Sequence, residues 1–135
     1  MNTIGRHRNA AHVIRNIAGI LCLSAILFIS IFALDAFDPS LTILQQTGAF
    51  LIHLLPSFVL LAMLLLAWKK AFIGGSIFLL TGLLLSPFIY THNYSMNQSV
   101  GMSLGIVAMI NLPFILVGML FLVSAYLQQE GHQQP

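Results

Sequence analysis

The feature that most constrains this chain is the apolar run of residues 49–68, AFLIHLLPSFVLLAMLLLAW, which Lys69 and Lys70 follow at once. His53 is its only acidic or basic residue. A helix of 20 residues rises about 30 Å, which is the thickness of the hydrocarbon core of a bilayer. A helix also satisfies its own backbone hydrogen bonds, as lipid requires. The run therefore predicts a membrane-spanning helix, with Trp68 and the two lysines at one interface.

The composition indicates that lipid is the solvent for most of the chain. Charged residues make up 6% of the 135 residues and hydrophobic residues 59%, whereas a soluble domain carries roughly 25% charged residues. The length leaves room for one domain. The net charge of +2 is too small to indicate a nucleic-acid partner. The single cysteine, Cys22, excludes an internal disulfide and is interpreted as a small packing residue.

Three further apolar segments repeat the pattern, at about residues 17–36, 71–90 and 103–126. Residues 1–16 form a basic arm before them, and residues 128–135 form a polar tail. The arm and first segment could be a signal peptide, but the apolar run is too long and no Ala-x-Ala site follows it, so we expect a retained anchor. The link 37–47 and the uncharged segment 91–99 are predicted to be polar loops. Two Asn-x-Ser triplets in the segment 91–99 match the glycosylation pattern only weakly.

The basic residues predict the orientation of the four spans. If the spans alternate in direction, the N-terminal arm, the turn after residue 68 and the C-terminal tail lie on one side. All five basic residues fall on that side: Arg6, Arg8, Arg15, Lys69 and Lys70. The positive-inside rule then places both termini in the cytoplasm. The predicted fold is an all-α, integral-membrane, up-and-down four-helix bundle formed by residues 17–127 in the inner (plasma) membrane.

Glycines mark the faces on which these helices are expected to pack, because small residues let helix backbones approach closely in lipid. The third and fourth spans carry them at helical spacing: Gly74, Gly75, Gly82, Gly101, Gly105 and Gly118. The GxxxG pair Gly101–Gly105 is explained equally well by packing within the chain and by dimerisation. Pro87 is expected to kink or end the third helix, and Pro113 to interrupt the fourth near its middle.

Four polar residues are predicted to converge in the outer half of a compact bundle: Asp35, His53, Ser86 and Asn111. An ionisable residue inside a membrane is a candidate functional site, and an Asp35–His53 pair could pass a proton. The structural alternative is that His53 donates one hydrogen bond that sets helix register. Asn111 is either a hydrogen-bonding link between helices or a ligand for a solute. The sequence leaves these alternatives open.

No nucleophile motif, phosphate loop, carboxylate pair or nucleotide fingerprint occurs, so we expect no enzyme. His53 and His92 lack the spacing that would indicate haem or a metal, and no cofactor is predicted. The leading hypothesis is a non-enzymatic structural or accessory protein of the lipid bilayer, which packs with itself as a homo-oligomer or with a membrane-protein partner. The alternative is a proton or small-solute conduit that uses Asp35, His53 and Asn111.

Several short motifs, in order and spacing, resemble an uncharacterised family of small four-span bacterial inner-membrane proteins, a domain of unknown function. The motifs are SIFALDAF (30–37), FLIHLLP (50–56), AWK (67–69), Gly74-Gly75 with Phe78, and LPFILVGMLF (112–121). The resemblance covers about residues 17–123. That family often carries an acidic residue before the glycine pair, where this chain has Ala71. The resemblance implies the four-span topology and a bacterial inner membrane, and it implies no activity.

Overall fold

The computed structural model describes residues 3–133 and contains four long helices in this range. They are α1 (Thr3–Ile31), α2 (Ile43–Lys69), α3 (Ala71–Asn97) and α4 (Val100–Gln133), with a short 3₁₀-helix, η1 (Phe32–Ala36), after α1. Each long helix contains a segment long and apolar enough to cross a membrane. No strand occurs among the described residues. The prediction of an all-α protein with four membrane-compatible helices is confirmed.

The helices extend beyond the predicted spans. α1 begins at Thr3, within the predicted basic arm, and α4 runs through the predicted tail to Gln133; residues 1–2 and 134–135 of those segments lie outside the described part. α3 continues through most of the predicted loop 91–99. Its polar side chains bond back to the preceding turn, since the Asn93 amide donates to the Ile89 carbonyl at 2.8 Å. The helix ends where Gln98 adopts a left-handed conformation with φ 53°.

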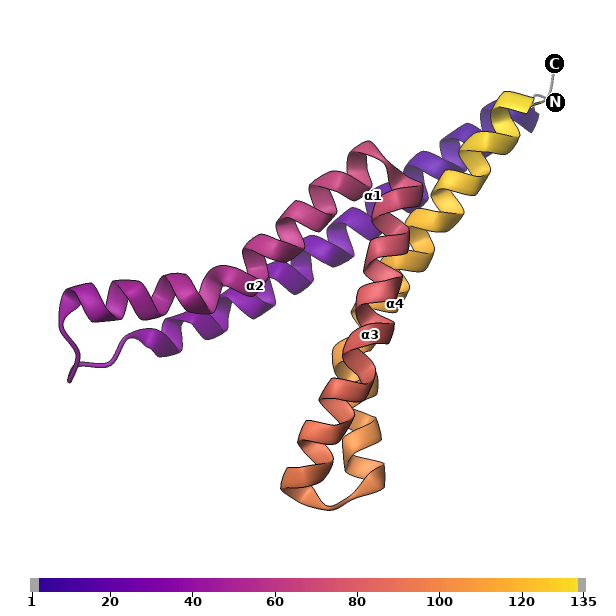
Figure 1. Cartoon of the computed structure of the whole chain (residues 1–135). Helices are drawn as coiled ribbons and strands as arrows, with labels where there is room; N and C mark the ends of the chain where they lie inside the picture. Colours follow the sequence, from indigo (N-terminus) through magenta and orange to yellow (C-terminus); the bar gives the residue numbers. More distant parts are fainter. Residues whose placement is uncertain (1–2, 134–135) are drawn as a thin grey trace.

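Prolines lie inside these helices and do not end them. α3 passes through Pro87 and continues to Asn97. α4 passes through Pro113, which has no backbone N–H to donate to the Met109 carbonyl. Figure 1 shows that α4 changes direction in its middle. A missing hydrogen bond at Pro113 accounts for a kink of this kind.

The bend in α4 gives the bundle an open shape with two arms. α1 and α2 form one antiparallel hairpin, the first arm, and α3 with the N-terminal half of α4 forms the second arm (Figure 1). Just beyond its bend, α4 still packs on the N-terminal part of α3, where Gly118 and Phe121 lie against Gly75. Its last turns then run beside the N-terminal half of α1, and these two segments form the base of the molecule. The most extensive contacts are accordingly those of α4 with α3 and with α1.

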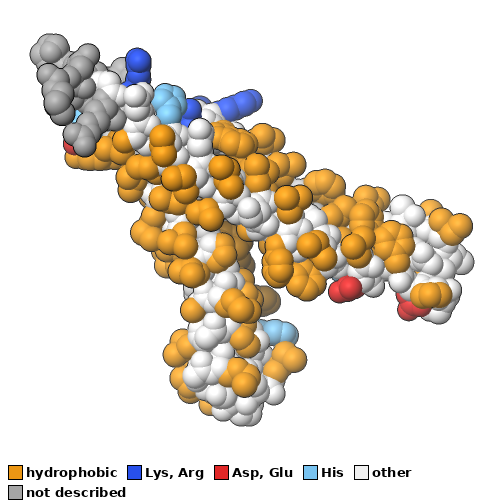
Figure 2. Space-filling model, turned by 180° about the vertical axis from the view of Figure 1, so that it is seen from behind, with side chains coloured by type: hydrophobic (Ala, Val, Ile, Leu, Met, Phe, Trp, Pro, Cys, Tyr) orange, Lys and Arg blue, Asp and Glu red, His pale blue; other side chains and the backbone are white. Residues whose placement is uncertain are grey.

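The buried core lies where the base meets the two arms. It contains small residues of α1, including Ala18 and Cys22, together with Leu64, Phe78 and Phe121. The rings of Phe78 and Phe121 stack with centroids 6.4 Å apart. Many other apolar side chains are exposed, and on the face seen in Figure 2 they cover much of both arms. An outward-facing apolar surface is what lipid solvates.

Candidate functional site

Ser86 and Asn111 meet in the contact between α3 and α4. The Asn111 side chain is 2% exposed, and its Nδ2 donates to Ser86 Oγ at 2.7 Å. Ser86 Oγ in turn donates to the Gly82 carbonyl at 2.9 Å. Within the described part of the chain, Asn111 Oδ1 is buried without a hydrogen-bond partner. The pair joins two helices, and it lies entirely within the second arm.

Asp35 and His53 lie on the first arm and are both exposed. Asp35 belongs to η1, at the tip of that arm. His53 Nδ1 lies 2.8 Å from the Ala49 carbonyl, so the ring bonds to its own helix. Of the four residues predicted to converge, the structure brings together Ser86 and Asn111 only. Counting residues along a helix predicts how deep each residue lies in the membrane. It does not predict that the two arms diverge sideways.

Three of the predicted packing glycines form a seam between α3 and α4. A Cβ placed on Gly75 would lie 2.8 Å from the Gly118 carbonyl oxygen, and one on Gly118 would lie 2.8 Å from the Leu79 nitrogen. A Cβ on Gly82 would lie 3.0 Å from Phe114 Cβ. Only glycine permits backbones to approach this closely.

The other three glycines have different surroundings. Gly74 faces the backbone and side chain of Ala67, where α2 turns into α3. Around Gly101 and Gly105, the GxxxG pair, the described residues place no atom within 4 Å of the position that a Cβ would take, apart from the adjacent residues and backbone of α4 itself. Their face of α4 is therefore open in the single chain.

Two hydrogen bonds that join α1 to other helices were not predicted. The hydroxyl groups of Ser30 on α1 and Ser57 on α2 share a hydrogen bond of 2.9 Å. Ser124 on α4 is fully buried and donates to the Ala11 carbonyl of α1 at 2.9 Å. In the sequence, the only indication of these bonds is the presence of serines within apolar runs. That pattern does not reveal which helix lies opposite each serine.

The basic residues predicted to set the topology lie at the base. Lys69 and Lys70 are exposed at the turn between α2 and α3. Arg8 is exposed on α1, and the guanidinium of Arg15 lies 3.1 Å from His12 Nδ1; the side chain of Arg6 is outside the described part. Figure 2 shows Lys and Arg gathered at the base. Of the acidic residues, Asp35 and Asp38 lie toward the tip of the first arm, and Glu130 lies near the C-terminal end of α4, at the base. The molecule is thus electrically asymmetric along its length.

A cavity of about 380 Å³ opens between the two arms, and we call it the inter-arm cleft. Its lining residues come from all four helices and are apolar. Phe78 and Leu60 form its floor and are 1% and 7% exposed. Phe28 of α1 and Met109 of α4 stand at its rim and are 63% and 72% exposed. The cleft can therefore accommodate an apolar group, but its lining has no polar group to orient a polar ligand.

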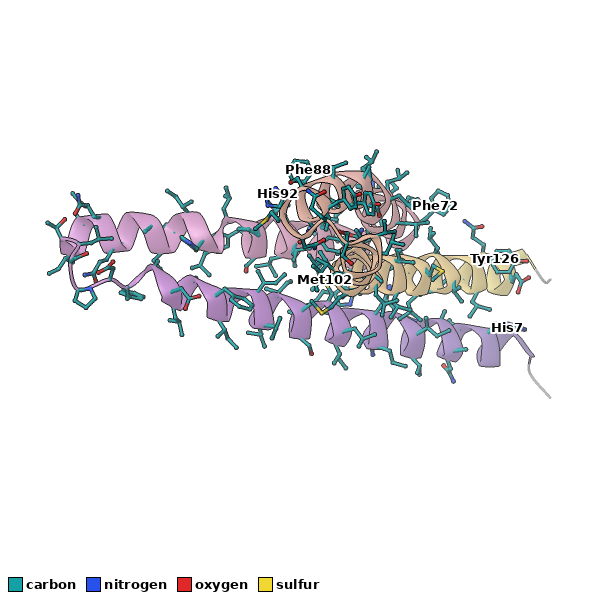
Figure 3. All side chains as sticks on the ribbon, turned by 90° about the horizontal axis from the view of Figure 1, so that it is seen from below. His7, Phe72, Phe88, His92, Met102 and Tyr126 are labelled. Carbon is teal, nitrogen blue, oxygen red and sulfur yellow. The ribbon has the colours of Figure 1, made fainter. Side chains whose placement is uncertain are left out.

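The face of α3 outside the cleft can be followed in Figure 3, which looks at the second arm from its tip. Phe88 and His92 lie on the side of α3 toward α2, and Phe72 lies on the opposite side. The rings of Phe88 and His92 stack with centroids 6.4 Å apart.

No group of three or more His, Cys, Asp or Glu residues suited to a metal ion occurs within the described range.

Comparison with known families decides what the chain is related to. Residues 7–133 match the family described as a domain of unknown function (DUF7670). The chain belongs to this family. The short motifs predicted a resemblance to a four-span family of unknown function. The family match and the four apolar helices confirm this prediction. The bacterial origin stays a prediction. No curated protein and no solved structure matches the chain.

Proposed function

We propose that this DUF7670 protein is a non-enzymatic structural or accessory component of a membrane, which assembles with itself or with another membrane protein through its apolar helix faces. The inter-arm cleft carries this proposal, because its walls are apolar and its rim residues Phe28 and Met109 are largely exposed. In each of the four candidate spans, only 17–28% of an 18-residue apolar segment is buried within the chain. Most helix faces therefore remain free for lipid or for a partner.

The placement of the polar groups favours this role over a conduit. A proton path through a membrane needs titratable groups linked by hydrogen bonds or water. Asp35 and His53 are exposed on the first arm, whereas the Asn111 amide is enclosed between α3 and α4 of the second arm. The space between the arms is lined by apolar side chains. These groups define no continuous polar path in one chain.

The location proposed for the protein is the plasma (inner) membrane, with both termini in the cytoplasm. The support is the gathering of Lys and Arg at the base, the end that also carries both termini (Figures 1 and 2). Cytoplasmic loops are enriched in these residues.

A flux assay in proteoliposomes tests the proposal against the conduit. Purified protein is reconstituted, a pH gradient is imposed and a pH-sensitive dye is followed, with folding checked by circular dichroism. We expect the same dye response as in empty vesicles. A flux that His53→Gln or Asp35→Asn abolishes in the folded protein would overturn the proposal, since glutamine and asparagine keep hydrogen-bonding groups but do not titrate near neutral pH.

A further inference from the structure

We infer that a second copy of this chain occupies the inter-arm cleft, and that the two copies interlock by inserting one arm each into the cleft of the other. This inference rests on the proposed function and names its partner. It is carried by the surface area of the chain, the shape and chemistry of the cleft, and the placement of charge.

The chain exposes more surface than its size requires. Its accessible surface is 9117 Å² at a mass of 14.8 kDa, whereas a compact monomer of that mass exposes about 7,000 Å². The splayed arms thus add roughly 2,000 Å² to each copy, or about 4,000 Å² to a pair. Obligate homodimers bury about 2,000–5,000 Å² in total. The excess surface is of the size that such a dimer encloses.

The cleft fits an apolar helix pair. It continues outward from the buried floor at Phe78 and Leu60 into the notch between the arms, which Figure 2 shows flanked by apolar side chains. Its walls carry no polar group that would select a polar ligand. In lipid, helices associate through close van der Waals packing. The rim residues Phe28 and Met109 gain such contacts from a helix placed between the arms.

The charges require the two copies to point the same way. A twofold axis along the membrane normal keeps the basic base of both copies at one interface, as the positive-inside rule demands. The same axis gives a closed, isologous interface in which each cleft receives one arm. It also keeps equivalent residues at equal depth, and it places the cleft-facing side of each inserted arm against the same side of the partner's inserted arm. The assembly ends at two copies because both clefts are then filled.

Cysteine crosslinking in native membranes tests this arrangement. Cys22→Ala removes the only cysteine. Two differently tagged versions of that chain are co-expressed, both with Met109→Cys or both with Phe28→Cys, and are bridged with a short bismaleimide before detergent is added. In the control, both versions carry Leu83→Cys, because the twofold pairing keeps the outer faces of the two second arms apart. Leu83 is 54% exposed and lies 11 residues from Phe72, hence on the same helix face, which Figure 3 shows turned away from α2.

We expect a crosslinked product that carries both tags for the Met109 pair or the Phe28 pair, whichever arm is inserted, at least fivefold above the Leu83 control. The mass of the wild type in native nanodiscs should equal two copies, which tests the inference without any substitution. A single-copy mass with retained lipid would mean that lipid fills the cleft and would overturn the inference. One copy bound to a different protein would also overturn it and leave the proposed function standing. The flux assay tests the proposed function separately.

Discussion

At the scale of single residues, hydroxyl groups link three different pairs of helices. Ser30 bonds to Ser57 between α1 and α2, Ser86 to Asn111 between α3 and α4, and Ser124 to the Ala11 carbonyl between α4 and α1. Each such bond in a membrane contributes only about 0.6–1.7 kcal/mol. Because each bond forms at one register only, the three bonds select the alignment of the helices more than they raise the stability.

The Ser86–Asn111 bond is open to a double-mutant cycle. Ser86→Ala should destabilise the protein by about 1–2 kcal/mol, because it leaves a buried amide donor unpaired. Once Asn111→Leu is also present, Ser86→Ala should cost less, so the two changes should couple by about 1 kcal/mol. Thermal or detergent unfolding followed by circular dichroism measures each value. Strictly additive effects would contradict the bond.

The loop between η1 and α2 carries a carboxyl group whose titration can be followed. The hydroxyl and the backbone N–H of Ser40 both donate to Asp38 Oδ1, at 2.7 and 2.8 Å, and they hold the pKa of Asp38 below its ordinary value of 3.8. A lowered pKa in the folded state stabilises the loop above pH 3.8, and this contribution is lost as the pH falls through the folded pKa.

Ser40→Ala should therefore raise the pKa of Asp38 toward 3.8, because it removes the side-chain donor, the largest cause of the lowering. The carboxyl carbon shift of Asp38, followed by NMR through an acid titration in micelles, measures this. An unchanged midpoint in the variant would contradict the hydrogen bond.

At the scale of elements, α3 and α4 pack by backbone contact at glycines, so side-chain volume decides whether they pair. Gly75→Leu and Gly82→Leu should each destabilise the protein by about 3 kcal/mol, because the new side chain would push the helices apart. Leu84→Ile, at a position 74% exposed, is the control and should change little. The measurement is the unfolding temperature in mild detergent. Equal sensitivity at all three sites would contradict the seam.

The GxxxG pair should behave in the opposite way. Gly101 and Gly105 have open space around them, so alanine meets no obstacle in the single chain. Gly101→Ala and Gly105→Ala should each stabilise α4 by about 0.5–1 kcal/mol, since alanine loses less backbone entropy on folding than glycine. Unfolding in the same detergent checks this. A loss of stability in either variant would indicate that another helix packs closely there.

At the scale of the whole molecule, the charge asymmetry predicts the orientation in the membrane. A reporter active only in the cytoplasm should give signal when fused after Gln129 and none when fused after Asn97. Changing Lys69 and Lys70 to alanine should yield a mixed orientation, because the remaining bias would rest on the N-terminal arginines. The fluorescence or enzyme activity of the fusions in whole cells is the measurement. The reverse pattern would falsify the assignment.

The sequence alone was enough to predict four membrane-compatible helices and an all-α fold. Apolar runs such as residues 49–68 are local, and lipid allows a run of that length almost no structure other than a helix. Helix ends were predicted less well, since the polar side chains of residues 91–97 bond back to α3 and prolong it.

Only the tertiary structure decided which helix faces meet. Pairing between helices depends on contacts far apart in the sequence, such as Gly75 with Gly118 and Ala11 with Ser124. It also depends on the bend of α4, after which the C-terminal turns of that helix run beside α1. This bend separates Asp35 and His53 from Asn111 and opens the inter-arm cleft. Hydropathy and helical periodicity describe each helix by itself, and therefore they could not predict an arrangement that arises from lateral packing.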